Sequence, residues 1–142
     1  MMNENLRKKA NSYNNIKIIH WIDRPKIVAL SKISDAAIAP YKNSEDFIVS
    51  IPNKIIDTLM LGLPLISSLE GEVKSLIKKH NIGYFFDEKL PLNQCIKMFS
   101  KLEGARNEFS ENAKNLYISE FEFNAVYDEM VLHLEGLKVN EW

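Results

Sequence analysis

The segment from Pro52 to Ser68 constrains the fold of this chain more than any other, because it encodes a helix, a tight turn and a strand in succession. Pro52 suits the first turn of a helix, where its fixed φ fits and its missing N–H is not needed. Gly62 suits a left-handed helix cap, and Pro64 prevents the helix from resuming. Apolar residues recur at helical spacing between them, at Ile55, Ile56, Leu59 and Met60. We therefore expect a helix over 52–62 and a buried strand over 65–68.

Strands and helices alternate along most of the chain. We expect strands over 16–22, 36–40, 65–68 and 82–86, and helices over 4–13, 24–33, 52–62, 72–80, 92–102, 105–118 and 124–137. This alternation predicts an α/β fold with a Rossmann-like, doubly wound parallel sheet of about four strands, followed by a C-terminal helical segment. Ligands of such sheets bind beyond the carboxyl ends of the strands. The polar segment 41–50, which follows a strand, is therefore expected to be a ligand-contacting loop.

The amino-acid composition limits the number of domains in the chain and the kinds of partner that it can bind. A chain of 142 residues with 46% hydrophobic content fits one domain, with an N-terminal helix over 1–15, an α/β core over 16–101 and helices over 102–142. The net charge of −1 lacks the basic surplus of proteins that hold nucleic acids by their phosphates. The single Cys95 excludes an intramolecular disulfide, and no histidine or cysteine stands at metal-ligand spacing. No segment reads as a signal peptide or a membrane span. We expect no metal, no nucleic-acid partner and a cytoplasmic protein.

Three polar residues cluster at the start of the helix over 52–62. Asn53, Lys54 and Asp57 lie at positions i, i+1 and i+4, near free N–H groups and partial positive charge that favour an anion. A carboxylate one turn further could bind the hydroxyl pair of a sugar or ribose. The pattern suggests a nucleotide-sugar site; the alternative is that Asp57 merely pairs with Lys54 or Asn53 on a solvated helix face.

The ordered motifs of the chain resemble the C-terminal, donor-binding half of a GT-B glycosyltransferase of the group 1, or family 4, type. The segments that carry the resemblance are HWIDRP (20–25), SDAAIAPY (34–41), PNKIIDTLMLGLPLI (52–66), GE (71–72), IG (82–83) and FEF (121–123). The resemblance implies a retaining, metal-independent hexosyl transfer from a nucleoside-diphosphate sugar, with a UDP- or GDP-sugar as donor and no cofactor. It further implies a role in cell-surface polysaccharide synthesis, peripheral to the inner membrane face through a partner.

The same resemblance assigns the donor-binding residues, while the catalytic residues stay unknown. Ile22 would meet the base, the helix start would face the diphosphate and Asp57 would bind the ribose. Tyr41, which directly follows a predicted strand, could line the sugar pocket; the alternative is that it only packs. The full donor-binding set is Ile22, Tyr41, Ser50, Ile51, Asn53, Lys54 and Asp57.

The chain also departs from the family pattern. Asp57 stands where a longer glutamate is usual, and Val49 stands where a second glutamate is usual, with Glu45 or Asp46 as possible substitutes. Two further strands and an N-terminal acceptor-binding half would be expected before 16–22. An alternative is therefore a non-catalytic nucleotide-sugar-binding or assembly module that pairs with a separate N-terminal half. A receiver-like fold is disfavoured, because Asp23 and Asp35 do not make a convincing acidic pocket.

Overall fold

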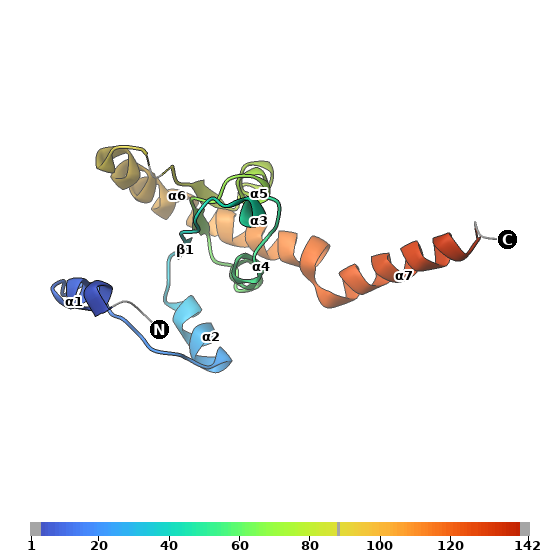
Figure 1. The fold of residues 1–142 in the computed structure, drawn as a ribbon, viewed down its shortest axis with the longest axis horizontal. Helices are drawn as coiled ribbons and strands as arrows, with labels where there is room; N and C mark the ends of the chain where they lie inside the picture. The colour runs from blue at the N-terminus through green and yellow to red at the C-terminus, as the bar shows by residue number, and fades with distance from the viewer. Residues whose placement is uncertain (1–3, 88, 140–142) are drawn as a thin grey trace. The chain divides into compact units, whose positions relative to one another are not determined.

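The computed structural model describes residues 4–87 and 89–139 (Figure 1). The chain divides into two compact units, Met1–Lys32 and Ile33–Trp142. The first unit contains the helices α1 (Glu4–Asn11) and α2 (Arg24–Lys32). The start of α2 is capped by Asp23, whose carboxylate accepts a hydrogen bond of 3.1 Å from the backbone N–H of Lys26, as expected for a helix N-cap.

The strand predicted over 16–22 is not present. The segment between α1 and α2 contains no strand. Its apolar side chains are exposed, Ile16 by 47%, Ile19 by 55% and Trp21 by 89%. A strand requires a hydrogen-bonded neighbour, and the described part of this unit contains no other strand. The apolar composition of 16–22 favours a strand, but the described residues offer no strand to pair with it, so this prediction is wrong. The sheet has three strands rather than about four.

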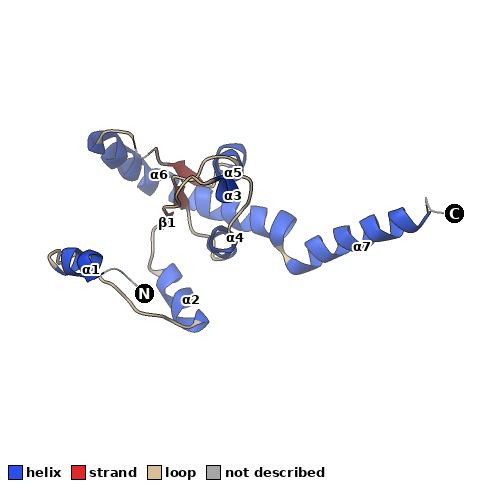
Figure 2. Ribbon diagram, in the orientation of Figure 1, coloured by secondary structure: helices blue, strands red, loops and turns tan. Residues whose placement is uncertain are grey.

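The second unit is built on that sheet (Figure 2). Its strands are β1 (Ala37–Ala39), β2 (Leu65–Ser67) and β3 (Gly83–Phe85), in the order β1-β2-β3. Both pairings are parallel. Two helices make the crossovers, α4 (Asn53–Met60) between β1 and β2, and α5 (Glu72–His80) between β2 and β3. This arrangement confirms the α/β, Rossmann-like prediction.

The helix-turn-strand segment folds as its proline and glycine residues predict. Pro52 is the N-cap of α4 with extended φ and ψ of −61° and 143°, and Leu61 is its C-cap. Gly62 has a φ of +64°, the left-handed conformation that most side chains disfavour. The backbone N–H of Leu63 then bonds to the carbonyl of Thr58 at 3.2 Å, which closes the helix end before β2.

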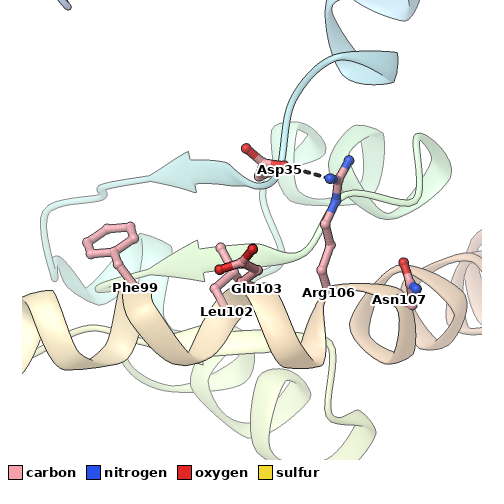
Figure 3. A pocket seen from close by; sticks show the side chains of 6 residues that line it. All are labelled: Asp35, Phe99, Leu102, Glu103, Arg106 and Asn107. Carbon is pink, nitrogen blue, oxygen red and sulfur yellow. Dashed lines mark ion pairs between the residues drawn. The ribbon is translucent and has the colours of Figure 1, made fainter.

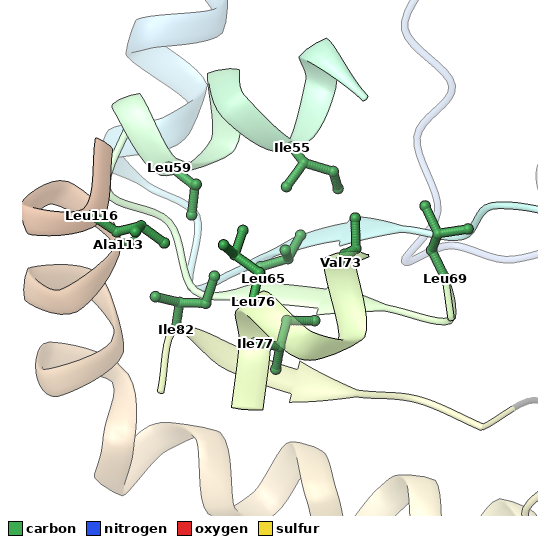
Figure 4. Close-up of a cluster of buried hydrophobic side chains, with 10 residues drawn as sticks. All are labelled: Ile55, Leu59, Leu65, Leu69, Val73, Leu76, Ile77, Ile82, Ala113 and Leu116. Carbon is green, nitrogen blue, oxygen red and sulfur yellow. The ribbon is translucent and has the colours of Figure 1, made fainter. Parts of the chain in front are cut away.

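The core has two parts, one on each face of the sheet, because successive side chains of a strand point to opposite faces. Leu65 of β2 packs in the larger cluster with α4, α5 and the end of the helix α6 (Leu92–Leu116). The next residue, Ile66, packs with Leu102 and Phe109 on the other face. The larger cluster, drawn in Figure 4, contains Ile55, Leu59, Leu65, Leu69, Val73, Leu76, Ile77, Ile82, Ala113 and Leu116.

The C-terminal helices differ from the prediction in one respect. A single helix, α6 (Leu92–Leu116), replaces the two helices expected over 92–102 and 105–118. Gly104 lies inside α6 on an exposed position, and the buried stripe through Leu102, Phe109 and Leu116 keeps its helical phase across it. Tertiary packing therefore outweighs the roughly 1 kcal/mol that a mid-helix glycine costs.

The chain continues from α6 into a short π-helix, η1 (Tyr117–Phe121), and then into α7 (Phe123–Val139). Figure 1 shows α7 leading away from the sheet. A one-turn helix, α3 (Glu45–Ile48), lies within the segment 41–50 that was expected to be wholly loop. Within the described residues, no helix is both long and apolar enough to cross a membrane.

Candidate functional site

The carboxyl edge of the sheet carries the candidate site. Pro40 follows β1 and Ser68 follows β2, and α4 begins on this side because it leads from the end of β1 back to the start of β2. The first N–H groups of a helix have no partner within it. Pro52 provides no side-chain cap for them, although the N–H of Ile55 bonds back to the carbonyl of Pro52 at 2.8 Å. The start of α4 thus presents backbone donors and partial positive charge at this edge.

A hollow of about 280 Å³ lies between the end of β1 and α4. Its lining residues are Ile38, Ala39, Pro40, Tyr41, Lys54 and Thr58. Two residues of the predicted donor set, Tyr41 and Lys54, are therefore brought together by the fold, as the ligand rule for parallel sheets leads one to expect. Lys54 is exposed, so its ammonium group can reach a ligand in the hollow. After the donor-binding role expected for Tyr41 and Lys54, we call this space the donor hollow.

Hydrogen bonds between the ends of β1 and β2 fix the loop that carries Tyr41. The Ser67 hydroxyl donates to the carbonyl of Ala39 at 2.8 Å. Asn43 bridges the same two loops, because its amide nitrogen donates to the carbonyl of Ser68 at 3.1 Å and its amide oxygen accepts from the N–H of Glu70 at 2.7 Å. These bonds hold the loop after β1 against the loop after β2.

A close backbone approach holds the next part of the same segment. Gly71, with a φ of +71°, lies so near α3 that an added Cβ would come within 1.9 Å of the carbonyl oxygen of Ile48. Ile48 itself packs against the main core. The rings of Tyr41 and Phe47 lie 5.3 Å apart between centroids, within the range of favourable aromatic pairs. Gly71 therefore allows α3 to sit where Phe47 can support Tyr41.

The other predicted donor residues do not line the donor hollow. Asn53 is the first residue of α4 and is exposed. Asp57 is also exposed but does not line the donor hollow. The Ser50 hydroxyl donates to the carbonyl of Asp46 at 2.9 Å, and Ile51 packs against the core. Ile22 belongs to the unit Met1–Lys32. None of the roles predicted for these five residues is tested by the arrangement.

The residues proposed as acidic substitutes, and the acidic Glu70, lie outside the lining of the donor hollow. Val49 is 73% exposed and is the C-cap of α3. Glu45 and Asp46 lie in the first turn of α3, both exposed, and neither lines the donor hollow. Glu70 forms a 2.7 Å ion pair with Lys74, and the Lys74 ammonium lies 4.3 Å from the centre of the Phe85 ring. The charge of Lys74 is thus already engaged, which leaves Lys54 as the cation that lines the hollow.

Thr58 is the lining residue with a polar side chain that the sequence analysis missed, besides the apolar Ile38, Ala39 and Pro40. It is 7% exposed and its hydroxyl donates to the carbonyl of Lys54 at 2.8 Å. Its position one turn after Lys54 was the available signal, because residues four apart share a helix face. In the described part of the chain, no cluster of three or more His, Cys, Asp or Glu residues could hold a metal ion.

A small parallel α/β sheet with a helix N-terminus and a lysine at its carboxyl edge defines a Rossmann-like domain of the kind that binds phosphorylated ligands. Residues 2–116 match the family described as glycosyl transferases, group 1, and the chain belongs to that family. The match agrees with the GT-B donor-half architecture. No curated protein and no solved structure matches the chain.

Proposed function

We propose that the donor hollow binds the diphosphate and sugar of a nucleoside-diphosphate hexose, and that the chain supplies the donor-binding side of a glycosyl transfer. The observation that carries this proposal is the convergence of Tyr41 and Lys54 on one hollow beside the start of α4. Family membership supports it, because group 1 enzymes are glycosyltransferases. The expected donor is a UDP- or GDP-sugar.

The chemistry that these groups provide is stabilisation of negative charge. Cleavage of the sugar–phosphate bond leaves a nucleoside diphosphate, on which negative charge develops. The Lys54 ammonium and the first N–H groups of α4 are donors fixed in advance at this place, and such donors lower the barrier where charge develops. Tyr41, held by Phe47, would pack against the sugar. Orientation of the acceptor would come from an N-terminal acceptor-binding half.

The finer assignments extend the same proposal. They are retention of the anomeric configuration, a family 4 subtype, a role in cell-surface polysaccharide synthesis, and a cytoplasmic location at the inner membrane face through a partner. Asp57 is proposed to reach the ribose from the rim of the hollow.

The proposal is tested by calorimetric titration of the full chain with UDP-glucose, GDP-mannose and inorganic pyrophosphate. We expect saturable binding, and Lys54→Gln should weaken it about tenfold, the effect of losing ~1.4 kcal/mol at a charged contact. The matched control is Lys78→Gln, since Lys78 is an exposed lysine in the last turn of α5. Equal affinity of the wild type and Lys54→Gln would contradict the proposal.

Asp57→Asn separates ribose binding from phosphate binding. It should weaken the binding of both nucleotide sugars and leave the binding of pyrophosphate unchanged. Mass spectrometry of the saturated chain then distinguishes the two functional alternatives. Release or transfer of the hexose indicates an enzyme, whereas binding with an intact donor indicates the non-catalytic module.

A further inference from the structure

A second hollow, of about 530 Å³, lies between α6 and the segment that leads into β1 (Figure 3). Its lining residues are Asp35, Phe99, Leu102, Glu103, Arg106 and Asn107. Asp35 precedes the first residue of β1, whereas Pro40 and Tyr41 of the donor hollow follow the last. The two hollows share no lining residue. We call the second one the α6 hollow.

The α6 residues of this hollow form a single strip along the helix. Phe99, Leu102, Glu103, Arg106 and Asn107 stand at positions i, i+3, i+4, i+7 and i+8, which share one helix face. The strip is about 12 Å long at the helical rise per residue. It offers an elongated surface that suits a ligand of two or three small rings.

Apolar groups occupy one end and the base of the strip. Leu102 is 7% exposed and belongs to the core cluster beneath. Phe99 is 42% exposed, and in Figure 3 its ring stands out from α6 beside the hollow. A single exposed phenylalanine is ordinary on a protein surface. Its place at the edge of a hollow, one turn from unpaired polar groups, is what distinguishes this one.

The arginine that lines the hollow, Arg106, already has partners within the protein. One terminal nitrogen of Arg106, Nη1, forms a 2.6 Å ion pair with Asp35. The other, Nη2, donates to the carbonyl of Ser34 at 3.2 Å. Because both ends of the guanidinium fork are engaged, Arg106 is poorly placed for the bidentate binding that phosphates and carboxylates receive from arginine. With Asp35 and Glu103 present as well, the lining carries net negative charge, which disfavours an anionic ligand.

Two polar side chains of the strip stay available. Glu103 and Asn107 are exposed, and within the described residues neither side chain has a hydrogen-bond or ion-pair partner. A carboxylate accepts hydrogen bonds only, while an amide both accepts and donates. These groups therefore match a neutral ligand that is rich in hydroxyl groups.

We propose that the α6 hollow binds a neutral glycan, with the Phe99 ring stacking on the C–H face of one pyranose and Glu103 and Asn107 bonding its hydroxyls. The face of an aromatic ring is electronegative, and the axial C–H groups of a pyranose are weakly electropositive, so the two surfaces attract. Concave sites that combine an aromatic wall with a few polar groups are typical of small-ligand binding. This site goes beyond the proposed donor function and does not depend on it.

The test is an NMR titration of the full chain with neutral linear trisaccharides of glucose, galactose, mannose and N-acetylglucosamine at millimolar concentrations. We expect saturable shifts of the backbone amides of Glu103 and Asn107 with at least one of them. Phe99→Ala and Glu103→Ala should each weaken binding about tenfold, because each removes one of the two recognition elements. Phe123→Ala and Glu111→Ala are the matched controls and should bind as the wild type does, since both residues are exposed and lie outside the hollow.

Two further titrations test the charge preference of the α6 hollow and its independence from the donor hollow. A trisaccharide that ends in glucuronic acid should bind less tightly than its neutral counterpart, because the lining is acidic. Saturating UDP should leave trisaccharide binding unchanged, which separates this site from the donor hollow. The absence of shifts with all four trisaccharides, wild-type affinity of Phe99→Ala, or tighter binding of the acidic trisaccharide would each overturn the proposal.

Discussion

Substitution of Gly71 by alanine perturbs the candidate site through the backbone alone. Gly71 is the N-cap of α5, with φ and ψ of +71° and −130°, a region that residues with a Cβ rarely adopt. The added Cβ would lie 1.9 Å from the carbonyl oxygen of Ile48 and 2.7 Å from its carbonyl carbon. The obstructing atoms belong to the backbone of α3, so no change of side-chain rotamer can relieve the overlap.

The cost follows from these two effects. The unfavourable backbone conformation costs about 1–3 kcal/mol, and the overlap of the added Cβ with the backbone of Ile48 costs about as much again. Since movement of α3 relieves part of both, we expect the free energy of unfolding to fall by about 3 kcal/mol. In a domain of this size that corresponds to a fall in Tm of about 10 °C. Because Phe47 moves with α3, its contact with the Tyr41 ring is lost, and the proposed donor binding should weaken as well.

Equilibrium urea denaturation of both proteins measures the change. Gly104→Ala is the matched control, because Gly104 lies inside α6 with no atom within 4 Å of an added Cβ. That substitution should raise the free energy of unfolding by about 0.5–1 kcal/mol. The two substitutions are expected to change the free energy of unfolding in opposite directions. The comparison therefore tests the geometry at Gly71 rather than a general effect of alanine. A Gly71→Ala protein within 0.5 kcal/mol of the wild type, the ordinary range of surface substitutions, would refute the reasoning.

Two further predictions concern the core and the loop. Leu59→Ala should lower the free energy of unfolding by about 2–5 kcal/mol, because Leu59 is fully buried and its removal leaves a cavity; thermal unfolding measures this, and an unchanged Tm would contradict the assigned core. Asn43→Ala should lower it by only about 1–2 kcal/mol, because two hydrogen bonds at an exposed position are lost. The same variant should weaken UDP-sugar binding in calorimetry, and unchanged affinity would show that the bridge to Ser68 and Glu70 does not position Tyr41.

The features that the sequence predicted well are those specified by a few adjacent residues. Pro52 and Gly62 mark the two ends of α4, and the structure places them at its N-cap and in the left-handed turn after it. The helix expected over 72–80 likewise coincides with α5, which ends at Asn81 in the left-handed region, with a φ of 50°. Caps and turns of this kind are set by local steric and hydrogen-bonding preferences, so neighbouring residues suffice to predict them.

The features that were predicted wrongly depend on distant parts of the chain. The apolar residues of 16–22 favour a strand, but whether one forms depends on a neighbouring strand that local sequence does not specify. Two helices were expected over 92–102 and 105–118, yet Phe109 and Leu116 continue the buried stripe that packs the single helix α6 on the sheet. The approach of Gly71 to Ile48 is also a tertiary feature. A glycine before a helix gives no sign of which carbonyl will lie against it.

The arrangement on α4 changes which residue carries most of the recognition in the candidate site. Asn53 and Asp57 are four residues apart and share one helix face, whereas Lys54 and Thr58 share the adjacent face. The donor hollow meets the face of Lys54 and Thr58. Asp57, for which the family resemblance implied ribose binding, does not line this hollow, whereas Lys54 does. The proposed function therefore implies that phosphate binding dominates the affinity, and Lys54→Gln should affect UDP- and GDP-sugars by the same factor. A markedly larger effect on one of the two nucleotides would show instead that Lys54 reads the base.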